Sequence, residues 1–513
     1  SCEKGSEQKT KTPVAVSNPI ILVEGKAVNI DSVLLKSYDS DLLKEFYLAS
    51  GFKSVWQSKK DRKEILEHLS NSEDEGLISA DYYYVILRRI EKKYTKLSDI
   101  ERAKYDILLT HSFQKYISHL ANGRLNPKLV YPNCDLKENE IKINETIAIM
   151  LKTDSIKYKI EQLIPNHLVY KSLKKALKTI NSFPVDTFSG IDIEKKIMLN
   201  DTNQSLLGIK RRLIYWKDLK PKDSLSTVYD NTTYEAMKHF QSRHGLAPDG
   251  VIGKGTIEAL NFSKKKRKEQ ILANLERWKW FPKEMGEEYL VVNIPDYKLT
   301  LVRNNDTLRT HKVIVGRDKR PTPILSSFLN NVILNPTWTV PPTILKEDVI
   351  PAIAKNRNYL SQTNIKIFDS KGHEILANEW QLSEAKKYRY VQSPGTYNSL
   401  GMIKFSFPNR FSIYLHDTNH RDFFVKQKRS LSSGCVRVDN PLKLAEYLLE
   451  NDSNWDLEKI TQTLQNEKTK HIKITKEVNI HILYWTAWAE NGTLIFRDDI
   501  YNLDSDLYRN LRK

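Results

Sequence analysis

His416 and Cys435 are the two side chains in this sequence whose types and spacing best suit nucleophilic catalysis. His416 ends the segment Phe411–His416, whose alternating pattern predicts a strand with Ser412, Tyr414 and His416 on one face. Cys435 lies nineteen positions further on, in a turn that contains Gly434. A thiol with an ordinary pKa of about 8.5 is mostly protonated at neutral pH, and a neighbouring imidazole is the usual group that activates it. The pattern therefore predicts Cys435 as a nucleophile and His416 as its general base and acid.

Three neighbours of this pair could assist the reaction. We expect backbone N–H groups around Gly434 and Cys435, together with the Tyr414 hydroxyl, to stabilise an oxyanion, at about 3 kcal/mol per donor. Arg437 keeps its charge and could hold a substrate carboxylate or shape the turn. A lone Cys is more often a small core residue, and a lone His on a strand is more often structural. The spacing by itself therefore does not decide for catalysis.

The elements that must position these residues form a mainly β C-terminal domain, which we place at residues 286–513. From Tyr289 the apolar pattern has a period of two, which predicts strands. Helical and polar character interrupts this pattern, so we expect an inserted cap at about 340–390, because long insertions in compact domains are commonly functional lids. The predicted strands cover 289–294, 298–303, 309–315, 331–335 and 411–416.

The chain before this domain is predicted to be helical. Apolar residues at steps of three and four predict a helical scaffold domain over 41–200, after a polar tether at 1–40. Three short helices with turn glycines predict a small module at 201–262. A linker at 263–285 would contain an amphipathic helix with Ile271 and Leu275 on one face. The fold class is therefore multidomain α+β.

Length and charge limit the class of protein further. A chain of 513 residues exceeds a single core, and the net charge of +18 suits a polyanionic environment such as nucleic acid, a membrane surface or a bacterial wall. The basic run Lys264–Lys268 is interpreted as a solvated helix face, so we expect no nucleic-acid partner. The three cysteines lack metal-ligand spacing and make no disulfide framework, so the sequence predicts no metal.

The first residues resemble the junction of a bacterial lipoprotein, where a small residue precedes the Cys that receives the lipid. Ser1 precedes Cys2, and a polar run follows. This arrangement predicts a lipid anchor at Cys2, with a chance terminal Cys as the alternative. No stretch of the sequence reaches the roughly 18 apolar residues that a membrane span needs.

Two segments resemble known families. The stretch Ala236–Thr256 is similar to the three-helix peptidoglycan-binding module of many wall enzymes, because Phe240-Gln241 and the turn glycines fall in register. His416-Asp417-Thr418 and Ser432–Val438 resemble the signature of the L,D-transpeptidase catalytic (YkuD-type) domain. Ser433 stands where the common form has a His, as in the large scaffold-bearing (YcbB-type) branch. Further segments resemble that branch: Phe46-Tyr47, Trp56, Asp74–Leu77, Asn274–Trp278, Asn335–Pro342, Ser393–Gly395, Leu400-Gly401 and Ile482–Trp488.

The resemblance implies a reaction. The enzyme would cleave the bond before the terminal D-Ala of a tetrapeptide stem and hold the acyl group, which ends in diaminopimelate, as a thioester on Cys435. An amine of a second stem would then form a 3–3 cross-link, without a cofactor. Ser433, Arg437, Trp338 and Tyr397 are the expected substrate contacts, with simple packing of the cap as the alternative for the two aromatic residues.

The resemblance also implies partners and a location. We expect peptidoglycan stem peptides as substrates, a D,D-carboxypeptidase and glycan synthases as partner proteins, and the periplasm of a Gram-negative bacterium as the location. Two other classes stay open. A cysteine peptidase or amidase would use the same dyad, although its common families place Cys before His. A non-catalytic wall-binding protein would carry a degenerate dyad. The acceptor amine also stays open.

Overall fold

The computed structural model describes residues 26–136, 139–153 and 155–513, and its chain folds into two compact units. One unit ends at Arg124 and resumes from Asn139 to Pro165; the other holds the chain from Leu125 and again from Asn166 to Lys513. The predicted anchor Cys2, and the tether up to residue 25, lie outside the described residues.

The first unit is helical and is built around the 24-residue helix α5 (Asp99–Asn122). A capping box between Ser98 and Glu101 begins this helix. Its fully buried Asp106 accepts hydrogen bonds from the Tyr47 hydroxyl and the Trp56 backbone N–H, both at 2.8 Å. The helical character predicted for this region is confirmed. The other helices are α1 (Ser32–Lys36), α2 (Asp41–Ala49), α3 (Lys59–Ser70), α4 (Tyr84–Glu91), α7 (Ile143–Thr153) and α8 (Ile156–Leu163).

The boundary between the units differs from the one expected at residue 200. Helix α9 (Leu168–Ser182) packs against α13 (Lys264–Lys279) and strand β15 (Ala487–Glu490), so it belongs to the second unit. Residues 125–136, with α6 (Pro127–Val130) and β1 (Cys134–Asp135), belong there too. Periodicity identifies these helices but does not show which core they join.

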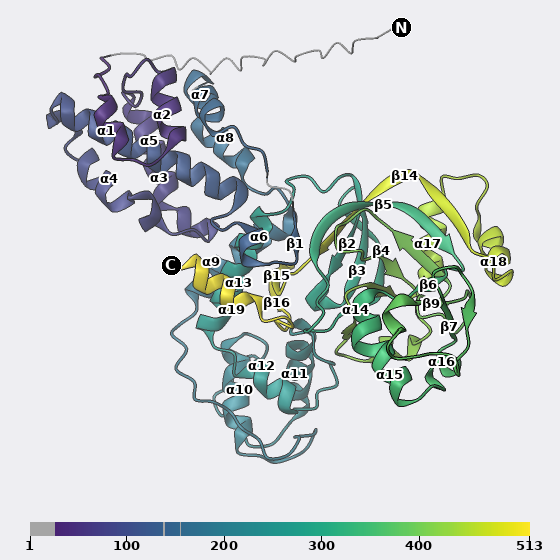
Figure 1. The fold of residues 1–513 in the computed structure, drawn as a ribbon. Coiled ribbons are helices and arrows are strands. Elements are labelled where there is room, and N and C mark those ends of the chain that lie inside the picture. The colour runs from purple at the N-terminus through teal and green to yellow at the C-terminus, as the bar shows by residue number, and fades with distance from the viewer. Residues whose placement is uncertain (1–25, 137–138, 154) are drawn as a thin grey trace, which may run out of the picture. The chain divides into compact units, whose positions relative to one another are not determined.

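The three helices of the predicted module are α10 (Ser205–Tyr215), α11 (Asn231–Arg243) and α12 (Lys254–Leu260), which share one apolar core (Figure 1). Gln241 holds the turn after α11, because its Oε1 accepts from the Gly250 N–H at 2.8 Å and its Nε2 donates to the Val251 carbonyl at 3.0 Å. Gly250 has φ +71°, and a Cβ there would lie 2.1 Å from the Tyr234 ring. The fixed spacing of the Phe-Gln pair and the glycines therefore has a structural cause.

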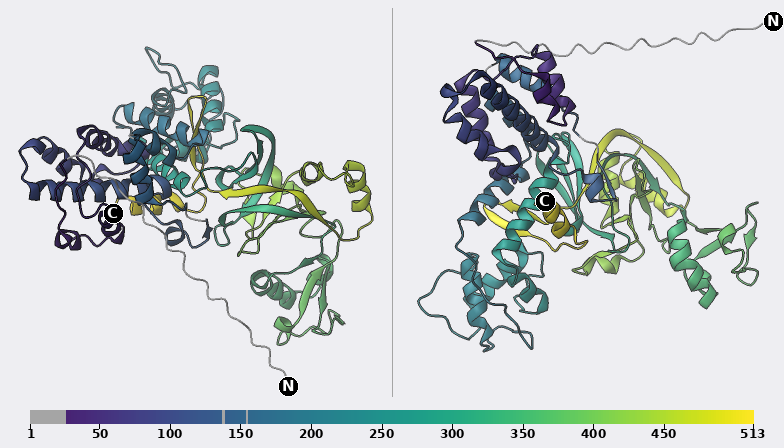
Figure 2. Two further views of the ribbon diagram at one scale, coloured as in Figure 1. Left: turned by 90° about the horizontal axis from the view of Figure 1, so that it is seen from above. Right: turned by 60° about the vertical axis from the view of Figure 1, so that its left-hand side comes forward.

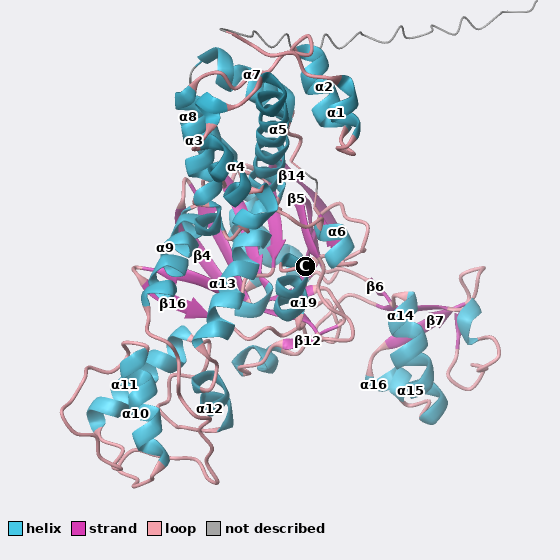
Figure 3. Ribbon diagram, turned by 90° about the vertical axis from the view of Figure 1, so that its left-hand side faces the viewer, coloured by secondary structure: helices cyan, strands magenta, loops and turns pink. Residues whose placement is uncertain are grey.

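Helix α13 is buried far more completely than an amphipathic linker would be. It begins at Lys264, inside the basic run, and Arg267 of that run is buried with its guanidinium over the rings of Phe262 and Phe496. Asn274 on the same helix donates to Thr486 at 2.8 Å. The interpretation as a solvated face is therefore wrong for Arg267. Helix α19 (Leu503–Leu511) packs beside α13 (Figure 3). In the part of the chain that the structure describes, no helix could cross a membrane.

The catalytic core candidate is a sheet whose strands close into a ring. The hydrogen-bonded order runs β5, β10, β11, β13, β4, β3, β2, β14 and back to β5. The strands are β2 (Glu288–Asn293), β3 (Lys298–Arg303), β4 (Asp306–Gly316), β5 (Ile324–Leu334), β10 (Ile403–Ser406), β11 (Leu415–His416), β13 (Val436–Val438) and β14 (Lys470–Leu483), with β12 (Ser430–Ser432) beside β4 and β16 (Thr493–Phe496) paired with β15. Helices α17 (Pro441–Leu449) and α18 (Leu457–Gln465) lie between β13 and β14.

The predicted insertion is a separate subdomain with its own apolar core. Figure 2 shows this green segment projecting from the sheet in both views. The chain leaves after β5 and returns at β10, which pairs with β5 through Leu334 and Ile403. Its elements are β6 (Trp338–Thr339), α14 (Pro342–Ile344), the π-helical turn Leu345–Val349, α15 (Ile350–Lys355), α16 (Tyr359–Gln362), β7 (Ile365–Phe368), β8 (Glu374–Ile375) and β9 (Arg389–Gln392). We call these elements the cap.

Candidate active site

The register of three neighbouring strands gathers polar side chains on one face of the ring. His416 of β11 pairs with Lys404 of β10 on one side and with Arg437 of β13 on the other. Register partners share a face, and so do residues two apart on a strand. Tyr414 and Cys435 therefore lie on the same face, two residues before His416 and Arg437 respectively. The Tyr414 and His416 rings confirm this, with centroids 5.6 Å apart.

The strand predicted at 411–416 is wrong over most of its length, since only Leu415 and His416 are extended in the sheet. Ser412 takes φ +56°, which is incompatible with a strand. The Asn409 side chain holds this loop, because its Oδ1 accepts the N–H groups of Phe411 and Ile413, each at 3.1 Å. The shared face of Tyr414 and His416 is nevertheless as predicted. Ser412 is not part of it.

The turn that carries Cys435 is fixed by buried hydrogen bonds. Gly434 has φ +118°, a region that favours glycine. Its carbonyl accepts from the Thr322 hydroxyl at 2.8 Å, and Thr322 is only 2% exposed. The Ser432 hydroxyl donates to the Cys435 carbonyl at 2.6 Å and accepts the Gly434 N–H at 3.2 Å. The Gly434 N–H is therefore already bonded in this structure and is not free to bind an oxyanion, contrary to our expectation.

Burial raises the pKa of the Cys435 thiol, so the resting side chain is protonated. Hydrogen bonds with the backbone and the hydroxyl of Tyr414 oppose this shift, as do the charges of Lys404 and Arg437. The Tyr414 hydroxyl is thus placed at the sulfur, as its predicted orienting role requires. Burial raises the pKa of Tyr414 well above its ordinary value, so the phenol keeps its proton.

His416 is buried as a neutral imidazole. Burial, followed by the charges of Arg437 and Lys404, lowers the pKa of His416 to about 3, although backbone hydrogen bonds with Asp417 and Leu400 act in the opposite direction. Its Nδ1 is buried and has no hydrogen-bond partner among the described residues. A neutral imidazole has one ring nitrogen without a hydrogen, which can accept a proton. The described residues show no hydrogen bond between His416 and Cys435.

Lys404 is the member of this face that the sequence did not identify. Its Nζ lies 3.9 Å from the centroid of the Tyr414 ring, and burial lowers the pKa of this amine. A lone Lys on a four-residue strand carries no signal by itself. Its importance comes from the pairing of β10 with β11, which the sequence does not show.

The four predicted substrate contacts lie in different settings. Trp338 of β6 lies close enough to Tyr414 to lower the pKa of its hydroxyl, so the start of the cap lies beside Tyr414. Ser433 is exposed beside Cys435, and its Oγ accepts from Arg320 Nη1 at 3.0 Å. Arg437 pairs in the sheet with His416. Tyr397, by contrast, is 71% exposed, and its backbone carbonyl accepts from Asn419 Nδ2 at 3.3 Å.

Arg320 connects the turn that carries Cys435 to the cap. Its guanidinium is only 10% exposed and bonds Asp348 at 2.6 Å and Glu347 at 2.5 Å. Both acids belong to the π-helical turn Leu345–Val349 of the cap. One side chain therefore bonds both Ser433 and the cap.

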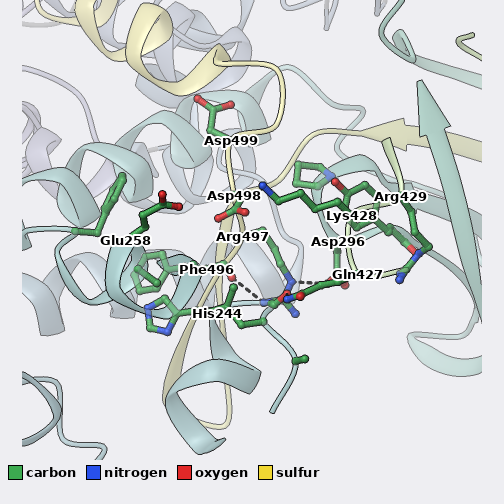
Figure 4. Close-up of a pocket in the computed structure, with 18 of the residues that line it drawn as sticks. His244, Glu258, Asp296, Gln427, Lys428, Arg429, Phe496, Arg497, Asp498 and Asp499 are labelled. Atoms are coloured by element: carbon green, nitrogen blue, oxygen red, sulfur yellow. Dashed lines mark hydrogen bonds and ion pairs between the residues drawn. The ribbon is translucent and has the colours of Figure 1, made fainter. Parts of the chain in front are cut away.

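A pocket lies away from this face. It has a volume of about 870 Å³ and is lined by the module, for example at His244 and Glu258, and by the C-terminal residues Phe496 to Asp499 (Figure 4). Arg497 fastens the two parts there, because its Nε bonds Asp296 at 2.5 Å and its Nη1 donates to the Arg243 carbonyl at 3.3 Å. Neither Cys435 nor His416 lines this pocket.

Comparisons with known proteins match three stretches of the chain. Three family models match: "Scaffold domain" at residues 41–177, "Putative peptidoglycan binding domain" at 203–260 and "L,D-transpeptidase catalytic domain" at 287–463. The "Putative L,D-transpeptidase" of Haemophilus influenzae is 37% identical over 221 residues, which are 42% of this chain and 45% of that protein. The match thus spans less than half the length of this relative.

Solved L,D-transpeptidases also align with the chain, at low similarity. The structure from Xylanimonas cellulosilytica is 14% identical with a TM-score of 0.19, covering 57% of this chain and 99% of that one. The structure from Stackebrandtia nassauensis is 10% identical with a TM-score of 0.21, covering 58% and 97%. TM-scores of this size support no inference. The family models and the curated relative show that residues 287–463 form a YkuD-type L,D-transpeptidase catalytic domain, in a chain that also carries a scaffold domain and a peptidoglycan-binding domain.

Proposed function

We propose that this chain is an L,D-transpeptidase that forms 3–3 cross-links through a Cys435 thioester. The observation that carries the proposal is the arrangement inside the matched catalytic domain. A thiol hydrogen-bonded to Tyr414 lies on the same sheet face as a neutral imidazole whose Nδ1 has no partner among the described residues. This is the combination of nucleophile and base that acyl transfer needs.

The first half-reaction forms the acyl-enzyme. The Cys435 sulfur attacks the carbonyl before the terminal D-Ala of a tetrapeptide stem, and His416 takes the thiol proton. The C–N bond breaks, the proton passes to the departing amine, and D-Ala leaves. General acid–base help of this kind contributes about 10²- to 10⁴-fold. Because the Gly434 N–H is occupied, we assign the oxyanion contact to the Cys435 N–H and the Tyr414 hydroxyl, and each donor of this type contributes about 3 kcal/mol.

The second half-reaction transfers the acyl group. The side-chain amine of a second stem attacks the thioester carbonyl, the C–S bond breaks, and the proton of the amine returns to the sulfur through His416. Trp338, beside Tyr414, would form one wall for the stem peptide.

The mass of the products tests this reaction. Purified wall fragments with tetrapeptide stems should give a cross-linked dimer and free D-Ala with the full chain. Cys435→Ala should abolish both products. Cys134→Ala is the matched control, because Cys134 is fully buried, its thiol pKa is raised to about 12, and its loss should leave the rate nearly unchanged. Free tripeptide without dimer would instead indicate a hydrolase, and cross-linking by Cys435→Ala would refute the proposed nucleophile.

We further propose a periplasmic location with a lipid anchor at Cys2, since the proposed substrate lies outside the cytoplasmic membrane. The resemblance of Ser1-Cys2 to a lipoprotein junction supports the anchor. Mass spectrometry of the N-terminal peptide from cells that express the gene would detect the lipid. An unmodified thiol at Cys2 would rule the anchor out.

A further inference from the structure

The face around His416 carries two cations, and no carboxylate among the described residues pairs with either of them. Lys404 and Arg437 flank His416 from the neighbouring strands β10 and β13. Nε and Nη1 of Arg437 are buried and have no hydrogen-bond partner among the described residues. Within the same residues, neither cation forms an ion pair with a carboxylate, and their charges act on His416 and Cys435. A half-buried cation without a counter-ion loses part of its hydration without compensation, so this arrangement is suited to receiving a negative group.

Ionised Cys435 would not satisfy both cations. The thiolate that forms during catalysis carries one negative charge, whereas Lys404 and Arg437 carry two positive charges. The sulfur also has its own donors in the backbone and hydroxyl of Tyr414. Charge balance on this face therefore leaves room for one further anion beside the reacting atoms.

We propose that Lys404, together with Arg437, forms a carboxylate receptor that binds the donor stem peptide next to Cys435. This inference rests on the proposed function, because it names how that donor is recognised. A tetrapeptide stem offers two carboxylates near the scissile bond, one on the terminal D-Ala and one on the diaminopimelate side chain. Arg437 supplies a planar fork that matches a carboxylate, and Lys404 supplies a point charge held over the Tyr414 ring.

Carboxylate binding would also act on the base. The charges of Arg437 and Lys404 lower the pKa of His416, so an anion that pairs with them would weaken this effect and ease proton transfer to the imidazole. The donor itself would therefore complete the electrostatics of the site. This gives Lys404 a role in binding and a positioning role toward His416.

Binding to a variant that cannot react tests the receptor. In full-length Cys435→Ala protein, calorimetry would compare three tetrapeptides: the parent, one amidated at the terminal D-Ala, and one amidated at the diaminopimelate side chain. Adding Lys404→Met should weaken parent binding about 10- to 100-fold, the value of a hydrogen bond to a charged group. Lys404→Arg should retain most of the affinity. Lys473→Met, at an exposed lysine on β14, is the matched control and should change nothing.

The amidated peptides identify the carboxylate. One of the two amidated peptides should bind the protein that retains Lys404 about as weakly as the parent peptide binds the Lys404→Met variant. The affinity of this amidated peptide should fall little further in the Lys404→Met variant. The peptide that behaves in this way shows which carboxylate is held. Unchanged parent affinity in Lys404→Met, equal losses for all three peptides, or no saturable binding of the parent would overturn the proposal. Because no turnover is measured, these results are independent of whether the chain cross-links stems.

Discussion

Replacement of Thr322 by Val should destabilise the turn that carries Cys435 without changing the size of the side chain. The Thr322 hydroxyl donates to the Gly434 carbonyl and accepts the Gly316 N–H, both at 2.8 Å. Valine fills the same volume but can make neither bond. A buried polar group left without a partner costs about 1–3 kcal/mol, and two such groups are created here. Some gain from the more apolar side chain offsets this, so we expect a loss of about 2–5 kcal/mol.

Thr322→Ser is the matched control for this prediction. Serine keeps the hydroxyl and both hydrogen bonds and removes one methyl group, which costs about 1 kcal/mol. The chain has several domains, so a single two-state free energy does not describe its unfolding. Hydrogen exchange of the segments around Gly316 and Gly434 reports the local effect, and the rate of D-Ala release reports the effect on chemistry.

The two variants should therefore separate clearly. In Thr322→Val the Gly316 and Gly434 segments should exchange faster, and the rate of D-Ala release should fall at least tenfold. In Thr322→Ser both quantities should stay near those of the unmodified chain. If Val and Ser gave the same exchange and the same rate, the hydroxyl would not hold the turn, and our account of the Cys435 geometry would be refuted.

Three further perturbations follow from the structure. Gly434→Ala should lower stability by about 1–3 kcal/mol through backbone strain at φ +118°. Steric overlap does not contribute, because the new Cβ would meet nothing closer than 3.8 Å. An unfolding temperature of the catalytic domain unchanged from the parent would contradict this. Arg437→Met should raise the pKa of His416 above its value of about 3, because a positive charge beside the ring is removed. The acid limb of the pH–rate profile, where the base gains its proton, should therefore move to higher pH. NMR titration of the His416 ring checks the same shift, and an unchanged pKa would refute the electrostatic explanation. Burial raises the pKa of Asp106 to about 6 from 3.8, so the folded state binds more protons than the unfolded state between these values, and this residue's contribution to stability should grow as the pH falls from 6 towards 4. Asp106→Asn should remove that pH dependence and cost about 2–4 kcal/mol, because backbone N–H groups that donate to Asp106 would lose their partner. Chemical denaturation at pH 4 and pH 7, followed by a signal from the first unit, would show whether either effect is absent.

The sequence predicts those strands whose two faces differ in burial. Strand β3 has the predicted bounds, 298–303, because its buried and exposed residues alternate at its start. Strand β14 was not recognised. Its first half is mostly exposed and its last four residues are all buried, since it pairs with both β2 and β5. A strand that changes neighbours along its length has no single period, so a pattern search misses it.

Local sequence patterns predicted part of the site, but the contacts between separate strands could not be predicted. Tyr414, His416 and Cys435 could be found from local spacing and motif. Lys404 could not, because its position beside His416 is set by the pairing of β10 with β11, and neither short strand shows its partner or register in the sequence. The occupied Gly434 N–H was also hidden, since it depends on the rotamer of the Ser432 side chain. Sequence patterns thus predicted the proposed reacting groups, whereas the neighbours that change their pKa values required the three-dimensional register.

The attachment of the cap has a consequence for protein engineering. The chain leaves the ring just after Leu334 and re-enters it at Ile403, and these two residues are register partners on adjacent strands. Antiparallel partners have Cα atoms only about 5 Å apart, a gap that a hairpin turn of a few residues can bridge. The whole intervening segment is therefore a cassette, which could be deleted or exchanged between chains while both host strands keep their hydrogen bonds.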